Sequence, residues 1–289
     1  MRRIGFVGLG NIGRPMAERL KDRGFDILGC DIDPKALEAL RRLGARVTGR
    51  TAECAGEDLI VMMVASDAQL EQACLGADGL IAAIDPARAP LLAVMSTVLP
   101  ETVRSVARAL AQSGVRVVDA PVSGGSLKAR DGTLTIMAGG EADDLARARP
   151  VLEQLGQTIH HCGALGSGML TKLINNLVGV TTHYLLAEAM TIAQKNGMNP
   201  ATLAAVMESS SGRTSGTGDW SATENIYRYN AASRESFAAV VAVTRKDLAH
   251  AVELARTAGA ATPMLDAVAR AHADTPDDQL FAAFRALSS

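Results

Sequence analysis

Three glycines near the amino terminus limit what this chain can fold into more than any other feature of its sequence. Gly8, Gly10 and Gly13 have the spacing G-x-G-x-x-G, directly after the apolar residues 4–7 and before a helical pattern. In that context the first glycine permits a tight turn, the second lets a pyrophosphate approach the backbone, and the third lets helix and strand pack closely. Asn11 and Ile12 complete the turn, and the free N–H groups at the helix start favour an anion. The alternative is an ordinary glycine-rich turn, which the flanking strand and helix disfavour.

The end of the second apolar strand points to a dinucleotide with an unmodified ribose. Asp31 lies 31 − 8 = 23 residues after Gly8, near the position where an acidic residue accepts the adenosine ribose hydroxyls. A ribose 2′-phosphate would face Asp31 and Asp33, and no Arg occurs at 31–34 to receive it. We therefore expect NAD, with NADP as the open alternative. Asp33 has a second interpretation, because it precedes Pro34 and can cap a helix that begins there.

Strand-like and helix-like patterns alternate through the first half of the chain. The expected strands are 4–8, 26–31, 59–64, 91–95, 115–119, 133–138 and 158–162, with helices at 16–23, 35–43, 102–112 and 143–155. This alternation is typical of a mainly parallel, doubly wound α/β sheet covered by helices on both faces. After residue 163 only helical patterns remain, at 167–196, 200–208, 240–257 and 263–273. The polar segment at 209–236 is expected to be either a functional loop or several short helical turns. We expect a dinucleotide-binding Rossmann domain at 1–163 and a helical domain at 164–289.

The charge and cysteine content of the chain favour a small-molecule partner over nucleic acid, a membrane or a metal ion. With 29 Lys+Arg against 31 Asp+Glu the net charge is −2, so no global field favours nucleic acid or an anionic membrane. The longest apolar run, 59–65, is too short to span a bilayer, and no signal peptide is evident, so we expect a cytoplasmic protein. Cys30, Cys54, Cys74 and Cys162 match no metal or disulfide spacing and are expected to be reduced, packed thiols. The five histidines lack the pairing of a metal site, so we predict none.

Two further segments carry chemistry that suits a small anionic ligand. Ser123, Gly124 and Gly125 follow a predicted strand, and their N–H groups and hydroxyl can grip a carboxylate, although a plain turn is equally compatible. Lys172 and Asn176 lie four residues apart on the first helix of the second domain and therefore share a face. A solvated lysine is the commoner outcome for such a residue.

Taken in order along the chain, these motifs resemble the β-hydroxyacid dehydrogenase family. The segments that carry the resemblance are Gly5–Met16, Asp119–Gly125, Gly168–Asn176 and Lys246-Asp247-Leu248. Members of the family include 3-hydroxyisobutyrate dehydrogenase and tartronate semialdehyde reductase, and we keep reduction of tartronate semialdehyde or a related semialdehyde as the alternative function. The resemblance implies a Rossmann domain, a helical second domain, and reversible, nicotinamide-dependent oxidation of a small 3-hydroxy acid to its semialdehyde.

The same resemblance assigns roles to individual residues. It implies that Lys172 is the general acid and base for the hydroxyl proton, that Ser123, Gly124 and Gly125 hold the substrate carboxylate, and that Asn176 orients the substrate. It places Val64, Thr97 and Lys246 in the cofactor-binding set, with Thr97 on the nicotinamide side and Lys246 closing the site.

Several positions depart from the family pattern, and they bear on the substrate. Val64-Ala65 stands where family members often have Leu-Pro. Ala239 stands where many members have Phe, and Phe237 lies two positions earlier. Lys128 and Arg130 follow the glycine pair, where the family usually has small residues. These departures favour a larger or more acidic 3-hydroxy acid, with Arg213 and Trp220 as further candidates that are more often ordinary surface residues.

Rival functions are an imine reductase, whose relatives typically replace the lysine, and a cofactor-binding protein without activity. A 6-phosphogluconate dehydrogenase would need a longer second domain than is present here. The apolar first helix of the second domain leads us to expect a homodimer or homotetramer.

Overall fold

Nine strands form one sheet in the amino-terminal part of the chain, in the order β3-β2-β1-β4-β5-β6-β8-β7, with β9 paired to β8. The strands are β1 (Arg3–Val7), β2 (Asp26–Cys30), β3 (Arg46–Thr48), β4 (Leu59–Met62), β5 (Leu91–Val94), β6 (Arg116–Asp119), β7 (Val122–Ser123), β8 (Leu134–Gly139) and β9 (Gly156–Gly163). Strands β1 to β6 are parallel, whereas β8 is antiparallel to β6 and β7. The chain order changes direction between β1 and β4, and ligands bind outside the carboxyl ends of strands at such a point.

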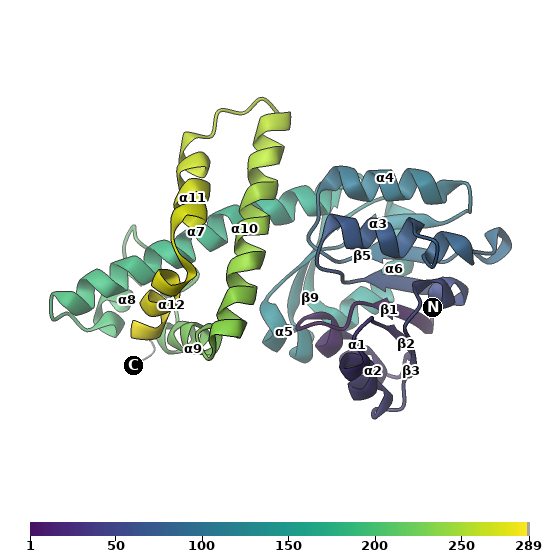
Figure 1. Cartoon of the computed structure of the whole chain (residues 1–289), viewed down its shortest axis with the longest axis horizontal. Coiled ribbons are helices and arrows are strands. Elements are labelled where there is room, and N and C mark those ends of the chain that lie inside the picture. The colour runs from purple at the N-terminus through teal and green to yellow at the C-terminus, as the bar shows by residue number, and fades with distance from the viewer. Residues whose placement is uncertain (288–289) are drawn as a thin grey trace. The chain divides into compact units, whose positions relative to one another are not determined.

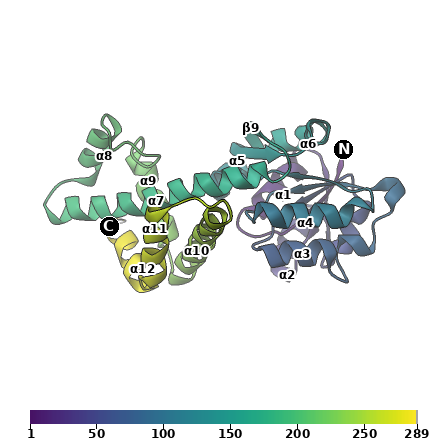
Figure 2. The same cartoon turned by 90° about the horizontal axis from the view of Figure 1, so that it is seen from above.

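The computed structural model describes residues 1–287, and the chain divides into two compact units after Lys172 (Figure 1). The first unit carries α1 (Gly13–Asp22), α2 (Pro34–Arg41), α3 (Asp67–Leu75), α4 (Pro100–Ala111), α5 (Gly125–Asp131) and α6 (Ala142–Leu155). Helices α1, α2, α5 and α6 bury Met16, Leu40, Ala129 and Leu152 on one face of the sheet. Helices α3 and α4, side by side in Figure 2, bury Leu70 and Val103 on the other face. The predicted doubly wound α/β domain is thus confirmed.

The second unit is entirely helical over its described residues. Its elements are α7 (Ser167–Lys195, which begins in the first unit), α8 (Pro200–Glu208), α9 (Trp220–Asn230), α10 (Arg234–Thr257), α11 (Pro263–Asp274) and α12 (Asp277–Ala286). Its aromatic core includes Tyr227, Phe237 and Phe284, with Trp220 packed against it. The polar segment 209–236 contains α9, whose start is capped where the Asp219 carboxylate accepts the Ala222 N–H at 3.0 Å. Across residues 1–287, no helix has the length and hydropathy needed to cross a membrane.

A buried carboxylate fixes the start of α7 to the end of β6. Asp119 is fully buried, and its two oxygens accept the N–H groups of Gly166 and Met169, each at 2.7 Å. Burial raises the pKa of Asp119 even though these backbone donors favour the charged form. The close approach requires glycines, because a Cβ on Gly139 would lie 2.4 Å from Asp119 Oδ1 and one on Gly168 would lie 2.2 Å from the Met137 carbonyl oxygen.

This contact explains where the two units divide. The sequence predicts a boundary at 163/164, where the strand-like pattern ends, whereas the compact units meet within α7, after Lys172. Because Asp119 binds the first turn of α7, the opening residues of that helix belong with the sheet. Elements β3, β7, α3, α5 and α12 have no predicted counterpart. Helix α9 lies in the polar segment, and α10 begins at Arg234 instead of residue 240.

Replacing Asp119 with Asn is expected to lower the free energy of unfolding by about 2–3 kcal/mol. An amide presents an NH2 group to one of the two backbone donors, so that donor is left buried without an acceptor. Urea unfolding followed by circular dichroism measures the change. The exposed Asp22→Asn, at the end of α1, is the matched control and should shift stability by less than about 0.5 kcal/mol. Equal effects of the two variants would contradict the role given to Asp119.

Candidate functional site

The glycine turn after β1 has the geometry of an anion cradle. Gly8 has a positive φ of 93°, and a Cβ there would lie 2.3 Å from the Met63 carbonyl oxygen. A Cβ on Gly13 would lie 2.0 Å from the Gly8 carbonyl oxygen, so helix α1 packs against the turn as closely as the backbone allows. Gly10 differs, because nothing lies within 4 Å of its Cβ position. The backbone at Gly10 therefore faces open space, which is what the approach of a pyrophosphate requires.

Asp31, just beyond β2, is anchored to this turn. One of its oxygens accepts the Leu9 N–H at 2.6 Å, and the other accepts the Asp33 N–H at 2.8 Å. Each oxygen retains a lone pair, so the carboxylate can still accept two ribose hydroxyls. Asp33 caps α2 instead, since its side chain accepts the Lys35 N–H at 2.9 Å. Of the two interpretations of Asp33, the structure supports the helix cap.

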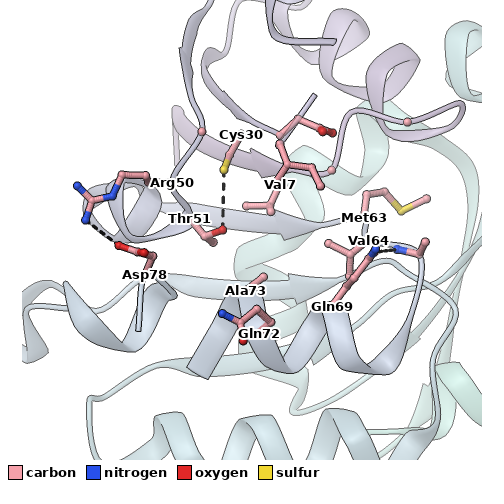
Figure 3. A pocket seen from close by; sticks show the side chains of 16 residues that line it. Val7, Cys30, Arg50, Thr51, Met63, Val64, Gln69, Gln72, Ala73 and Asp78 are labelled. Atoms are coloured by element: carbon pink, nitrogen blue, oxygen red, sulfur yellow. Dashed lines mark hydrogen bonds and ion pairs between the residues drawn. The ribbon is translucent and has the colours of Figure 1, made fainter. Parts of the chain in front are cut away.

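A cavity of about 450 Å³ opens at the carboxyl ends of β1, β2 and β4 (Figure 3). Its volume lies within the range typical of small-molecule sites, roughly 300–1,000 Å³. Its walls are Val7, Gly8, Gly10, Cys30, Asp31, Ile32, Gly49, Arg50, Thr51, Met63, Val64, Ala65, Gln69, Gln72, Ala73 and Asp78. The cradle, the acidic residue and the cavity together fit the adenosine and pyrophosphate portions of a dinucleotide.

The cavity contains only part of the predicted cofactor set. Gly8, Gly10, Asp31 and Val64 line it, whereas Asn11, Ile12 and Gly13 belong to the turn behind it, Thr97 follows β5, and Lys246 lies in α10. Three polar residues of the lining were not foreseen from the sequence. Arg50 follows β3, Gln69 lies in α3, and Asp78 lies in the loop after α3. Strand β3 is only three residues long, and α3 buries only Leu70 and Cys74, so it shows no apolar stripe at helical spacing.

The Val64-Ala65 departure has a local structural consequence. The Ala65 N–H donates to the side-chain oxygen of Gln69 at 2.8 Å, next to the start of α3, where Ser66 accepts the Gln69 N–H at 3.2 Å. A proline at position 65 has no N–H and could not make the first of these bonds. The loop on this side of the cavity is therefore tied to α3 through a donor that Leu-Pro would remove.

The Ser-Gly-Gly segment forms the turn between β7 and α5. Ser123 ends β7, and Gly124 and Gly125 both have positive φ, 140° and 73°. The Lys128 side chain lies over the first of these glycines, because a Cβ on Gly124 would be 2.7 Å from Lys128 Cδ. The Gly125 Cβ position faces open space. The segment thus presents accessible backbone beside an exposed cation.

The start of α7 carries a buried lysine. Lys172 is only 7% exposed and follows the Asp119-bound Met169 by three residues, so its backbone position is set by the sheet. Its low exposure argues against the solvated lysine that the residue type alone favours.

In the second unit, Asn176 is held by Asp247. The Asn176 amide nitrogen donates to Asp247 Oδ2 at 2.6 Å, and the Lys246 ammonium lies 3.4 Å from Asp247 Oδ1. Asp247 is 4% exposed, so this amide has a fixed orientation. In the sequence, Asp247 appears only as part of the Lys246-Asp247-Leu248 motif. Its burial next to the Lys246 ammonium is what identifies it as a site residue.

The remaining substrate candidates, Arg213 and Trp220, make contacts within the second unit. Arg213 forms a 2.9 Å ion pair with Glu208, and Trp220 begins α9 and packs on the aromatic core. Phe237 is buried in that core, whereas Ala239 is exposed.

Comparison with known proteins places both parts of the chain. Residues 3–166 match the family described as the NAD binding domain of 6-phosphogluconate dehydrogenase. Residues 166–280 match the family described as NAD-binding of NADP-dependent 3-hydroxyisobutyrate dehydrogenase. A 3-hydroxyisobutyrate dehydrogenase of Pseudomonas aeruginosa is 39% identical over 93% of this chain and 90% of its own length.

Two other similar proteins are associated with serine. An NAD-dependent L-serine dehydrogenase of the same organism is 34% identical over 91% of this chain and 89% of its own length. The structure of Mycobacterium tuberculosis 3-hydroxyisobutyrate dehydrogenase with L-serine is 29% identical, covers all of both chains and has a TM-score of 0.81.

Gly10→Ala is expected to lower the affinity for NADH at least tenfold without unfolding the protein. The added methyl group enters open space, so the free energy of unfolding should change by less than about 0.5 kcal/mol, while the methyl group occupies the approach of the pyrophosphate. Fluorescence titration with NADH measures the affinity. Gly179→Ala, at an open position within α7, is the matched control and should leave the affinity unchanged. Undiminished affinity in the Gly10 variant would remove this turn from the site.

Proposed function

Because this chain belongs to the β-hydroxyacid dehydrogenase family, that of 3-hydroxyisobutyrate dehydrogenase, we propose that it oxidises a small 3-hydroxy acid to its semialdehyde, with Lys172 as general acid and base. The protein is an NAD(P)-dependent oxidoreductase acting on a CH–OH group. The observation that carries the residue assignment is a lysine 7% exposed, positioned by a helix start that is hydrogen-bonded to Asp119.

The cofactor residues act by binding and orientation. Gly8 and Gly10 provide the surface for the pyrophosphate, Asp31 accepts the ribose hydroxyls, and Val64 covers the same cavity. Asn11, Ile12 and Gly13 shape the turn, and Thr97 and Lys246 complete the proposed set. When bound, NAD supplies the acceptor for the two electrons that the alcohol loses.

The substrate residues divide the remaining work. Lys172 Nζ takes the hydroxyl proton during oxidation and returns it during reduction. The N–H groups of Gly124 and Gly125 and the Ser123 hydroxyl hold the carboxylate. Asn176 orients the substrate, and Asp247 acts through it by accepting a hydrogen bond from the amide nitrogen, which directs the amide oxygen to accept a hydrogen bond from the substrate hydroxyl.

The preferred substrate in this proposal resembles 3-hydroxyisobutyrate. L-Serine is the second candidate, because a 34% identical relative is an L-serine dehydrogenase and a structural relative was solved with L-serine. In both molecules the carboxylate carbon is C1 and the hydroxyl group is on C3. Tartronate semialdehyde reduction stays a prediction from the sequence, as does a cytoplasmic location.

The proposed chemistry is tested by nicotinamide absorbance with 3-hydroxyisobutyrate, L-serine and glycerate, each with NAD and with NADP. Turnover of at least one of these acids is expected. NADH binding without turnover of any of them would contradict the proposed substrate class.

Lys172→Ala is expected to lower kcat by a factor of about 10²–10⁴, the usual contribution of one proton-transfer group, while NADH affinity stays within twofold. Stopped-flow turnover and NADH titration on the same preparation separate the two effects. Lys195→Ala, at the exposed end of the same helix, is the matched control and should change neither. If the Lys172 variant keeps its kcat, the lysine is not the proton-transfer group.

We also propose a homodimer or homotetramer formed through α7. Ile174, Val178, Leu185 and Ile192 are 53–64% exposed, and their spacings of four, seven and seven residues hold them on one face of the helix. An exposed apolar stripe of this kind, here interrupted by Thr181 and Glu188, is typical of a helix that packs against a partner. A second copy of the chain is the partner that the proposal requires.

Leu185→Glu combined with Ile192→Glu is expected to give a smaller particle in size-exclusion chromatography with light scattering. Two carboxylates on the stripe would have to be desolvated in the assembly, which opposes association. Leu43→Glu, which changes an exposed apolar residue of the first unit, is the control and should leave the particle size unchanged. A wild-type protein that is already monomeric would refute the proposed assembly.

A further inference from the structure

The cavity lining carries one cation and one further carboxylate that no sequence motif identifies. Arg50 Nη2 and Asp78 Oδ1 are 3.0 Å apart, and both residues line the cavity (Figure 3). Arg50 is the only Lys or Arg among the described residues of that lining. The cavity therefore contains two carboxylates and a single positive charge.

Backbone contacts fix both members of the pair. The Arg50 N–H donates to the Thr48 hydroxyl at 3.1 Å, and Thr48 is 7% exposed at the end of β3. The Asp78 carbonyl oxygen accepts the Ala52 N–H at 3.0 Å. The two side chains thus meet because the segment after β3 and the loop after α3 are hydrogen-bonded to each other, not because of a chance contact between flexible ends.

The strand register places Arg50 next to the position of the ribose. Strands β2 and β3 are parallel with Cys30 opposite Thr48, so Asp31 and Arg50 follow neighbouring strand ends. A Cβ on Gly49 would lie 3.9 Å from the Asp31 carbonyl oxygen, which confirms how close the two segments are. A ribose whose hydroxyls are held by Asp31 has its 2′ position within reach of a long side chain from this segment.

We propose that Asp78 is a determinant of cofactor selectivity, because it engages Arg50 and so withholds the only cation of the cavity from a ribose 2′-phosphate. This inference deepens the proposed function and rests on its cofactor site. Asp31 repels the phosphate directly, and Asp78 acts through Arg50. An arginine is the side chain best suited to a phosphate, since its planar fork donates two parallel hydrogen bonds.

The expected size of the effect follows from the exposure of the pair. The side chains of Arg50 and Asp78 are 62% and 72% exposed, and exposed ion pairs are weak and screened by salt. Releasing Arg50 should therefore strengthen binding of a 2′-phosphate by about threefold to fivefold at low salt, and less at high salt. The direct repulsion by Asp31 sets the larger part of the preference.

Calorimetric titration of the full chain with two probes tests this inference. Adenosine 2′,5′-bisphosphate carries the 2′-phosphate, and adenosine 5′-monophosphate lacks it, so both report on the cavity without requiring turnover. Asp78→Asn should raise the affinity for the bisphosphate about threefold to fivefold at low salt and leave that for the monophosphate within twofold. In Arg50→Gln/Asp78→Asn the gain should disappear. Glu101→Gln, which breaks an exposed pair on α4, is the matched control and should alter neither affinity.

Three results would overturn the inference. The first is an unchanged affinity for the bisphosphate in Asp78→Asn, and the second is an equal change in affinity for both probes. The third is a gain in bisphosphate affinity that persists without Arg50, which would assign the phosphate to another cation such as Lys35. Each of these leaves the proposed function intact when the monophosphate and NADH bind the wild type normally. A wild type that binds neither the monophosphate nor NADH would instead overturn the cofactor site and this inference together.

Discussion

The hydrogen bonds from the first turn of α7 to the buried Asp119 carboxylate are the interaction on which the candidate site depends. A carboxylate in the interior is tolerated only when donors surround it, and here the donors are the N–H groups that a helix start leaves unpaired. The Asp119 carboxylate, at the end of β6, therefore accepts hydrogen bonds from backbone N–H groups at the start of α7 and joins the two elements. Gly139 and Gly168 remove the side chains that would keep the two apart. Lys172 owes its place to this contact, because it follows the Asp119-bound Met169 by three residues on the same helix.

Asp31, just after the carboxyl end of β2, also serves two structural purposes. The oxygen that accepts the Leu9 N–H holds the glycine turn next to Gly10, so the residue proposed to bind the ribose also shapes the proposed phosphate cradle. Such preorganisation lowers the entropic cost of binding, because the groups that meet the ligand are already ordered. It also means that changes at Asp31 act on both halves of the cofactor site.

The sequence predicted those parts of the fold whose signal is local. The strands and helices of the doubly wound sheet follow from alternating patterns, and Gly8, Gly10 and Asp31 follow from a spacing that geometry dictates. Strands β3 and β7 are three and two residues long, too short for a pattern to appear. The Arg50–Asp78 pair and the role of Asp119 depend on contacts between residues 28 and 47 to 50 positions apart. Nothing local encodes such a meeting, so only the folded chain reveals it.

The distribution of aromatic residues gives the two units different optical properties. Trp220, Tyr184, Tyr227 and Tyr229 are the only tryptophan and tyrosines of the chain, and all lie after Lys172. Tryptophan and tyrosine fluorescence therefore reports on the helical unit alone. A reduced nicotinamide bound to the first unit would have no tryptophan or tyrosine of that unit beside it. Energy transfer from Trp220 to such a cofactor would measure the separation of the two units directly, with no label attached to the protein.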